Sequence, residues 1–122
     1  MVNATVYPLS EVASDNPIPL LYRKRVFGER MLLAQVHLKA GCHVALHHHE
    51  NEQVAYVVRG KVRWILGEPG TSEHREVVAG EDTVIHLPSH FPHAVHAMED
   101  TLIIDLLSPP GEMGIDRQSS EN

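Results

Sequence analysis

The feature that most constrains the fold is a succession of short β-forming runs, separated by Gly, Pro and polar turns. No long stretch has apolar residues at the three- and four-residue spacing of an amphipathic helix. Arg59-Gly60, between two of these runs, predicts a tight hairpin. About eight short strands with frequent turns predict an all-β fold, an antiparallel sandwich or barrel. The expected strands cover residues 31–38, 43–47, 54–58, 61–66, 76–79, 83–87, 94–97 and 102–107.

The chain has 122 residues, which fits a single domain whose ends differ from its β-rich body. We expect the barrel to cover residues 21–108. Several prolines in residues 1–20 favour an extended N-terminal arm. Residues 109–122 are mostly polar, begin with two prolines, and predict a mobile C-terminal tail.

Composition and charge exclude several classes of partner. The chain has 10 Lys and Arg against 16 Asp and Glu, a formal net charge of −6, and no basic stripe, so we expect no nucleic acid. No apolar run approaches the ~20 residues that cross a bilayer. The first residues lack the pattern of a secretory signal. We therefore expect a cytoplasmic protein with no membrane partner. The single cysteine, Cys42, excludes an internal disulfide and a multi-cysteine zinc site.

Histidine is unusually frequent and clustered, which indicates a metal site. Side chains at i and i+2 of a strand share a face, so His47 and His49 can reach one ion while His48 points away. If residues 54–58 return antiparallel beside residues 43–47, the side-chain oxygen of Gln53 comes near the same ion, and His93 joins from the second cluster. Three imidazoles and one oxygen suit a divalent transition metal: Ni, Zn, Fe, Mn or Cu. Two short windows hold His43, His47, His48, His49, His86, His90, His93 and His96.

The remaining histidines have less specific interpretations. A single histidine is more often a surface or hydrogen-bonded core residue than a ligand. We expect the other four clustered histidines to line the pocket, to orient a ligand through a hydrogen bond, or to be structural. They are His43, His86, His90 and His96.

Asp105 lies in the apolar run 102–107, where a carboxylate is costly unless it is paired or functional. It shares a strand face with Ile103 and Leu107. If that face lines the barrel, Asp105 points into the pocket with a raised pKa and suits general acid–base catalysis. Alternatively, Asp105 faces solvent or forms a structural ion pair, for example with Arg63.

These residues resemble the two sequence motifs of the cupin superfamily. The resemblance implies an antiparallel double-stranded β-helix, the jelly-roll barrel of cupins, and a homodimer. Two positions depart from the motifs: Gln53 replaces the usual glutamate, and His90 replaces the usual glycine. The first motif comprises Gly41, His47, His49, Gln53 and Gly60. The second comprises Gly80, Pro88, His90 and His93.

The last run adds a resemblance to the small cupins of pectin and alginate breakdown, which convert 4,5-unsaturated uronates to linear keto sugars. Asp105 and the following Ser108-Pro109-Pro110 match that family, in which the metal binds the sugar acid and the aspartate moves protons. Leu107 replaces an aromatic residue of the family, and Gly111 replaces an arginine that clamps a carboxylate. Arg117 in the tail is a possible substitute for that arginine.

Three functions follow from the predicted site. The first is a non-redox metalloenzyme that isomerises a small anionic substrate bearing a carboxylate, such as an unsaturated uronate, with Asp105 as the proton shuttle. A neutral Gln53 leaves the ion its full charge, which favours this Lewis-acid chemistry. The second is a metal-dependent dioxygenase, and the third is a non-catalytic module that binds a small molecule or metal. Trp64 either fills the core or stacks on a sugar.

Overall fold

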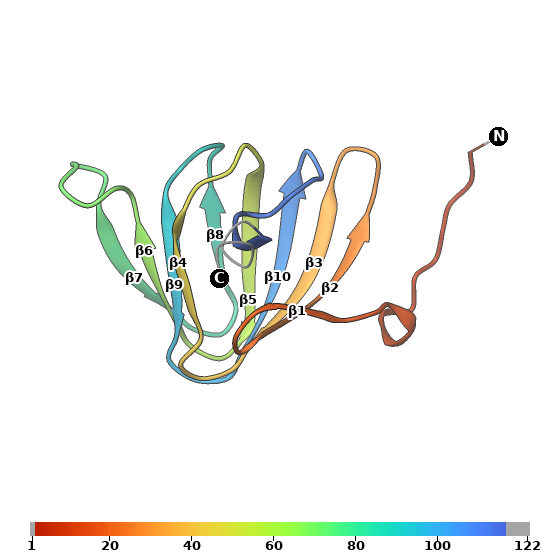
Figure 1. Cartoon of the computed structure of the whole chain (residues 1–122), viewed down its shortest axis with the longest axis horizontal. Coiled ribbons are helices and arrows are strands. Elements are labelled where there is room, and N and C mark those ends of the chain that lie inside the picture. Colours follow the sequence, from red (N-terminus) through yellow and green to blue (C-terminus); the bar gives the residue numbers. More distant parts are fainter. Residues whose placement is uncertain (1, 117–122) are drawn as a thin grey trace.

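Strands make up nearly all the regular structure in the computed structural model of the chain, which describes residues 2–116 (Figure 1). Within that range no helix is long and apolar enough to cross a membrane. The first elements are the 3-10 turn η1 (Leu9–Glu11), β1 (Asp15–Ile18), β2 (Leu21–Phe27), β3 (Leu32–Leu38), β4 (His43–His47) and β5 (Glu52–Arg59). They are followed by β6 (Val62–Leu66), β7 (Arg75–Ala79), β8 (Thr83–Leu87), β9 (His93–Ala97) and β10 (Thr101–Ser108).

The strands form two antiparallel sheets, which confirms the predicted all-β fold. One sheet has the order β1-β2-β3-β10-β5-β8, and the other has the order β4-β9-β6-β7. From β3 onward the chain passes repeatedly between the sheets, so strands distant in sequence, such as β3 and β10, lie side by side. This is the connectivity of a jelly roll, and the two sheets face each other across the interior (Figure 1).

The core follows from strict alternation along the strands. On β3, alternate side chains from Leu32 to Leu38 are buried and point into the barrel. β10 pairs with β3 in register, with Ile103 opposite Val36 and Asp105 opposite Ala34. Asp105 therefore belongs to the inward-facing row of an otherwise apolar sheet.

The predicted hairpin at Arg59-Gly60 is wrong, although a tight turn occurs there. β5 pairs with β10 and β8, whereas β6 pairs with β7 and β9, so this turn carries the chain from one sheet to the other. Gly60 has a φ of 101°, and a Cβ at that position would lie 2.6 Å from the carbonyl oxygen of Asp100. Only glycine fits such a close approach in the left-handed region.

The expected pairing of residues 54–58 with residues 43–47 is also wrong. β4 pairs with β9 in the smaller sheet, and β5 lies in the larger one. Gln53 therefore does not reach the histidines along a shared hairpin. It lies on β5 of the larger sheet and faces His49, which lies in the short connection between β4 and β5. Gln53 still lies beside His49, but the distance between them depends on how the two sheets pack together.

The N-terminal region contains two strands that the sequence did not predict. Residues before η1 extend away from the barrel (Figure 1), as expected of an arm, but β1 and β2 form the edge of the larger sheet. The inward-facing row of β2 has Arg23 beside the apolar Leu21, so the strand lacks the apolar alternation by which the others were recognised. The homodimer implied by the family resemblance stays a prediction.

The described part of the expected C-terminal tail does not project from the barrel. Residues 114–116 form one helical turn, and Met113 and Ile115 are only 6% and 5% exposed. Their apolar side chains belong to the core cluster, so this segment packs into the barrel interior. Arg117, the predicted substitute for the missing arginine, lies outside the described residues.

Candidate metal centre

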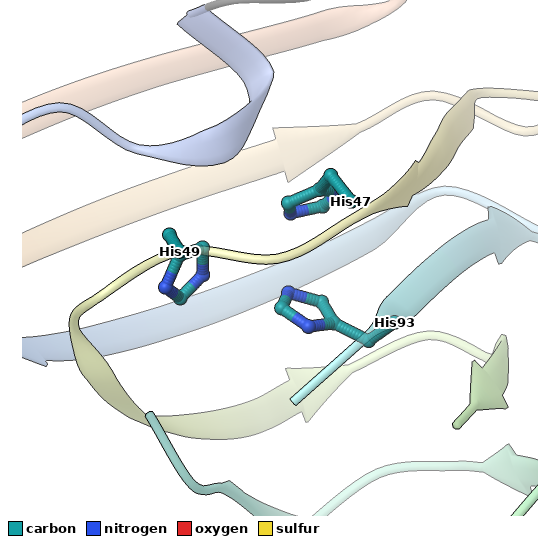
Figure 2. Close-up of side chains that lie close together, drawn as sticks. All are labelled: His47, His49 and His93. Atoms are coloured by element: carbon teal, nitrogen blue, oxygen red, sulfur yellow. The ribbon is translucent and has the colours of Figure 1, made fainter. Parts of the chain in front are cut away.

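Three of the four predicted metal ligands form a compact histidine cluster. His47 ends β4, His49 follows in the connection to β5, and His93 begins β9 directly opposite His47 in the ladder. One ring nitrogen from each histidine lies within 4.8 Å of the other two. Figure 2 shows the three imidazoles gathered from these separate segments. Their convergence supports the predicted ligand set.

Hydrogen bonds to the backbone fix the tautomer of every ring in the cluster. Nδ1 of His47 lies 2.8 Å from the carbonyl oxygen of Ala45, Nδ1 of His49 lies 2.9 Å from that of Asn51, and Nδ1 of His93 lies 2.8 Å from that of Phe91. A carbonyl oxygen only accepts, so each Nδ1 must donate its proton. Each neutral ring then has its lone pair on Nε2, the arrangement typical of metal-binding histidines.

His93 is also held in the neutral state that a metal requires. Burial and the nearby His47 ring lower the pKa of His93 to about 3 from its ordinary value of 6.5. Protonation of one ring would place positive charge beside two other imidazoles in a buried space. His93 therefore remains an unprotonated ligand at neutral pH.

Gln53 completes the predicted set with an oxygen that faces His49. Its Oε1 lies 3.1 Å from Nε2 of His49, and both atoms are acceptors when Nδ1 of His49 carries the proton. Two acceptors at this separation fit a shared cation, because adjacent ligands ~2.1 Å from one ion are about 3.0 Å apart in octahedral and about 3.4 Å apart in tetrahedral coordination. These four side chains therefore fit a divalent transition metal.

Asp105 fixes the orientation of the Gln53 amide. Nε2 of Gln53 donates a hydrogen bond of 2.8 Å to Oδ1 of Asp105, which turns Oε1 toward the histidines. Asp105 is 6% exposed and points into the barrel, so neither of the structural alternatives, solvent exposure or a pair with Arg63, describes it. A glutamate, the usual motif residue at position 53, would instead place its carboxylate against that of Asp105.

The environment of Asp105 suits proton transfer. Burial raises its pKa to about 7 from an ordinary value of 3.8, although the hydrogen bond from Gln53 acts in the opposite direction. A carboxyl group with a pKa near neutrality can both accept and return a proton under physiological conditions. It lines the same cavity as the three histidines.

The cavity around these groups is small and mostly apolar. Its volume is about 50 Å³. The C-terminal residues Met113, Gly114 and Ile115 form part of its wall, and so does Trp64. The apolar lining from the strands comprises Leu21, Val36, Leu38, Val44, Val95 and Ile103.

A family model described as the cupin domain matches residues 34–108, which include the histidine cluster, Gln53 and Asp105. The chain belongs to the cupin family. No curated protein matches its sequence.

Solved structures of other cupins share this architecture. An RmlC-like cupin from Shewanella frigidimarina NCIMB 400 has a TM-score of 0.79 at 19% identity, over 90% of this chain and 95% of the other. KdgF from Halomonas sp. has a TM-score of 0.76 at 26% identity, over 90% of this chain and 97% of the other. Oxalate decarboxylase from Bacillus subtilis, described with Mn(II) centres, has a TM-score of 0.77 at 20% identity, over 91% of this chain but 32% of the other.

His90 takes the position of a glycine in the cupin motif, and its backbone keeps the conformation that glycine favours. His90 has a φ of 63°, in the left-handed region that glycine adopts most readily. Its N–H donates a 2.7 Å hydrogen bond to the carbonyl oxygen of His49. The loop before β9 is thereby tied to the connection after β4, and the two halves of the metal centre are held together.

The other clustered histidines lie outside the cavity of this cupin. Rings of His43 and His96 pack with centroids 6.2 Å apart, and those of His48 and His90 are 5.9 Å apart. His86 forms an exposed pair with Glu52, with Nε2 2.7 Å from Oε2. Of the three roles considered for His43, His86, His90 and His96, lining of the cavity is the one that the structure does not show.

Two contributions to the cupin site were missed or left open from the sequence. The wall formed by residues 113–115 was missed, and its signal was a pair of apolar residues in a polar tail. Trp64 was left between core and sugar contact. It is 2% exposed and lines the cavity, and its Nε1 has no hydrogen-bond partner among the described residues. Trp64 is therefore buried like a core residue and also forms part of the wall of the site.

Proposed function

We propose that this cupin is a non-redox metalloenzyme that isomerises a small substrate bearing a carboxylate, with a 4,5-unsaturated uronate as the leading candidate. The observation that carries the proposal is the position of Gln53 between the histidine cluster and Asp105. One amide faces the metal ligands with its oxygen and the candidate acid–base group with its nitrogen. A substrate held at the metal therefore lies next to Asp105.

The choice of substrate rests on similarity as well as on the site. The sequence resembles the uronate-ketonising cupins through its metal-binding residues, Asp105 and Ser108-Pro109-Pro110. Among solved structures it is similar to KdgF from Halomonas sp. over nearly the whole length of both chains. These similarities support an unsaturated uronate as the substrate.

The reaction requires one proton to move within the substrate. The proton leaves the anomeric hydroxyl group, the bond between C1 and the ring oxygen breaks, and an aldehyde forms at C1. The resulting enolate is protonated at C4 and becomes a ketone at C5, so the product is an isomer of the substrate. Asp105 accepts the first proton and delivers it to C4, for which its raised pKa is suitable.

The neutral ligand set favours this chemistry over oxygen activation. A metal held by His47, His49, His93 and Gln53 would supply Lewis acidity toward an oxygen of the substrate. No ligand of that set carries a negative charge, so the ion keeps its full attraction for an anion. A carboxylate ligand would instead help to stabilise a higher oxidation state.

Conversion of an unsaturated uronate by the metal-loaded protein tests the proposal directly. Loss of the conjugated double bond is followed by ultraviolet absorbance, and dissolved oxygen is measured in the same sample. We expect turnover without oxygen consumption. Asp105→Asn should lower the rate by about 10²- to 10⁴-fold and leave the metal content unchanged. Asp82→Asn is the matched control, because Asp82 is exposed and bonded to Tyr56.

Two other outcomes would replace this proposal. Oxygen uptake coupled to substrate loss would indicate a cupin dioxygenase. Full metal occupancy without turnover of uronates or consumption of oxygen would indicate a binding module. An unchanged rate in Asp105→Asn would remove the aspartate from the mechanism even if the isomerisation itself occurred.

A further inference from the structure

The cavity is too small for the substrate that the proposed function requires. Its volume is about 50 Å³, whereas sites for small molecules are usually about 300–1,000 Å³. Space for a metal ion and a water molecule is available, but space for a sugar acid is not. Some part of the wall must therefore move before a uronate can reach the metal.

The C-terminal strap, residues 113–116, is the part of the wall that fills this space. Met113 and Ile115 insert apolar side chains into the barrel, and Gly114 lies against the ring of His47. A Cβ on Gly114 would fall 1.9 Å from Cδ2 of that ring. The strap therefore lies directly over a metal ligand, where substrate would have to enter.

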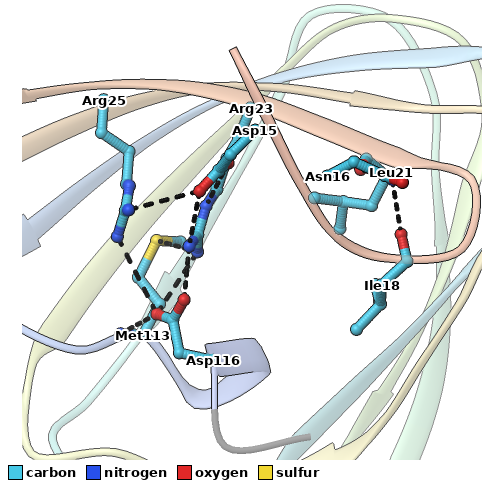
Figure 3. A network of polar contacts seen from close by, with 8 residues as sticks. All are labelled: Asp15, Asn16, Ile18, Leu21, Arg23, Arg25, Met113 and Asp116. Atoms are coloured by element: carbon cyan, nitrogen blue, oxygen red, sulfur yellow. Dashed lines mark hydrogen bonds and ion pairs between the residues drawn. The ribbon is translucent and has the colours of Figure 1, made fainter. Parts of the chain in front are cut away.

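A buried arginine holds the strap in place. Arg23 on β2 is 2% exposed and forms ion pairs with Asp15 on β1 and with Asp116 on the strap (Figure 3). Oδ2 of Asp116 also accepts a 2.9 Å hydrogen bond from the backbone N–H of Met113. Burial would lower the pKa of Arg23, but Asp116 and Asp15 together raise it above its ordinary value. The guanidinium is thus a permanent cation with two carboxylate partners.

The two carboxylates on Arg23 differ in how they are anchored. Asp15 belongs to a strand of the larger sheet and contacts Nε of Arg23 at 2.9 Å. Asp116 belongs to a strap that follows the last strand. Arg25 lies near both, with Nη2 3.4 Å from Asp15 and Nη1 3.9 Å from Asp116. The four charges balance, so a carboxylate from a ligand can take the place of Asp116 without changing the net charge.

Met113 connects Arg23 to the cavity wall. Sδ of Met113 lies 3.5 Å from Nη1 of Arg23, and Met113 is also part of the cavity wall. Arg23 is paired with Val36, which lines the cavity from the next strand. β2 is two strands from β10, and Asp105 lies two residues along β10 from Ile103, which is level with Arg23, so about 12 Å separates the backbones of Arg23 and Asp105. A six-membered sugar ring and the arginine side chain together span that distance.

We propose that Arg23 binds the carboxylate of the substrate, and that Asp116 of the strap occupies this subsite until an anionic ligand displaces it. The inference rests on the proposed function for the identity of the ligand as a sugar acid. Displacement of Asp116 releases Met113, Gly114 and Ile115 together, which enlarges the cavity and uncovers the His47 ring. Arg23 thus selects an anionic substrate and couples its binding to the opening of the metal site.

Binding of a saturated sugar acid tests Arg23 separately from catalysis. D-galacturonate and neutral D-galactose are titrated calorimetrically into the metal-loaded full chain, since neither has the double bond that isomerisation needs. Asp116→Asn should bind galacturonate about tenfold more tightly, the effect of one charge-assisted hydrogen bond. Arg23→Gln should bind it at least about tenfold more weakly. Galactose has no carboxylate, so its affinity should not fall in Arg23→Gln and should rise in Asp116→Asn by no more than that of galacturonate.

Asp15→Asn is the control for a purely electrostatic effect, since it removes the same charge from the same arginine but leaves the strap attached. An increase in galacturonate affinity equal to that of Asp116→Asn would overturn the role of the strap. The rate at which a chelator extracts the metal gives a second measurement, which does not depend on the folding of Arg23→Gln. Asp116→Asn should accelerate extraction about tenfold, as expected for loss of a charge-assisted hydrogen bond, and an unchanged rate would also overturn this role.

Failures of the two proposals are distinguishable. Galacturonate binding that depends on Arg23 and Asp116, without turnover of an unsaturated uronate, would reject the isomerase and retain the carboxylate subsite. Turnover with the same KM in Arg23→Gln and in the parent protein would reject the subsite and retain the isomerase. Equal affinities for galacturonate in the parent, Asp116→Asn and Arg23→Gln would likewise reject the subsite.

Discussion

The two sides of the cavity are stabilised in different ways. On the strand side, the rings of His47, His49 and His93 each donate Nδ1–H to a backbone carbonyl, and the ladder between β4 and β9 sets the spacing of His47 and His93. On the strap side, two apolar side chains and the ion pairs of Asp116 hold four residues in place. The strand side is part of the sheet structure, whereas the strap side is attached to it.

This difference separates metal binding from access to the metal. A site whose ligands are fixed by backbone hydrogen bonds loses little conformational entropy when an ion binds, so the barrel itself determines affinity for the metal. A strap without strand pairing can open at a smaller free-energy cost than the sheets. Substitutions on the strand side should therefore change metal content and stability, and those on the strap side should change access.

The largest expected effect is loss of the metal from the strand side. His93→Ala removes one of three imidazole ligands. Loss of a residue that only orients a ligand typically lowers metal affinity by about 10- to 100-fold, and we expect a larger fall here. His96→Ala is the matched control on the same strand, because the His96 ring packs on His43 outside the cavity. Elemental analysis of both purified variants measures the difference. Equal metal content in His93→Ala and the parent protein would show that the cluster is not the metal site.

Truncation of one apolar side chain on each side tests whether the strap is separable from the core. Leu107→Ala, on β10, should lower the free energy of unfolding by about 2–5 kcal/mol, because the sheets cannot collapse onto the space it leaves. Ile115→Ala should cost less than about 1.5 kcal/mol, since the strap can shift or detach. Urea denaturation of the metal-free variants measures both values. Similar losses would show that the strap is as integral to the core as β10.

The fold and the strand side were largely predictable because they depend on local spacing. Alternation and turn residues placed eight of the strands to within a few residues, and the i, i+2 spacing brought His47 and His49 to one site. His93 was predicted from the second histidine cluster, and Gln53 from a pairing of residues 54–58 with residues 43–47 that the structure does not contain. The pairing of strands was not predictable by the same means, because the Arg59-Gly60 turn is compatible both with a hairpin and with a passage between sheets.

The strap side was not predictable because its stability depends on residues distant in sequence. Arg23 is a charged residue at an inward position, which hides the alternation of β2. It can be buried there because Asp15 and Asp116 neutralise it, the latter from the opposite end of the chain. Neither partner is visible from local sequence, and a short polar segment that contains Met113 and Ile115 resembles an ordinary tail until the cavity is known.

The pH dependence of stability should also separate the two sides in the metal-free protein. Asp105 has a folded-state pKa of about 7 and an ordinary value of 3.8, so it stabilises the fold as pH falls through that interval. His93 has a folded-state pKa of about 3 and an ordinary value of 6.5, so it destabilises the fold as pH falls through its interval. The two effects oppose each other where the intervals overlap. Burial raises the pKa of Asp116, but the hydrogen bond and charge of Arg23 outweigh it and lower the pKa below its ordinary value of 3.8. The stability contributed by the strap side should therefore change only below pH 3.8.

Single substitutions should reveal each of these opposing effects. Relative to the parent protein, Asp105→Asn should lose stability on acidification from pH 7 toward 4, by at most about 1.4 kcal/mol per pH unit. His93→Ala should gain stability over the same range. Urea titrations at several pH values in the presence of a chelator measure these differences. Parallel curves for both variants and the parent would show that neither group has a shifted pKa.

The smallest effect concerns Trp64, a strand-side residue whose indole N–H has no hydrogen-bond partner among the described residues. An unpaired buried N–H costs about 1–3 kcal/mol, and Trp64 Nε1 has no partner within the described part of the chain. Trp64→Phe removes that cost together with some packing, so stability of the metal-free protein should change by less than about 1 kcal/mol. Galacturonate affinity should fall about three- to tenfold, because an acceptor on the ligand loses its donor. A large loss of stability with unchanged affinity would instead make Trp64 a packing residue of the barrel.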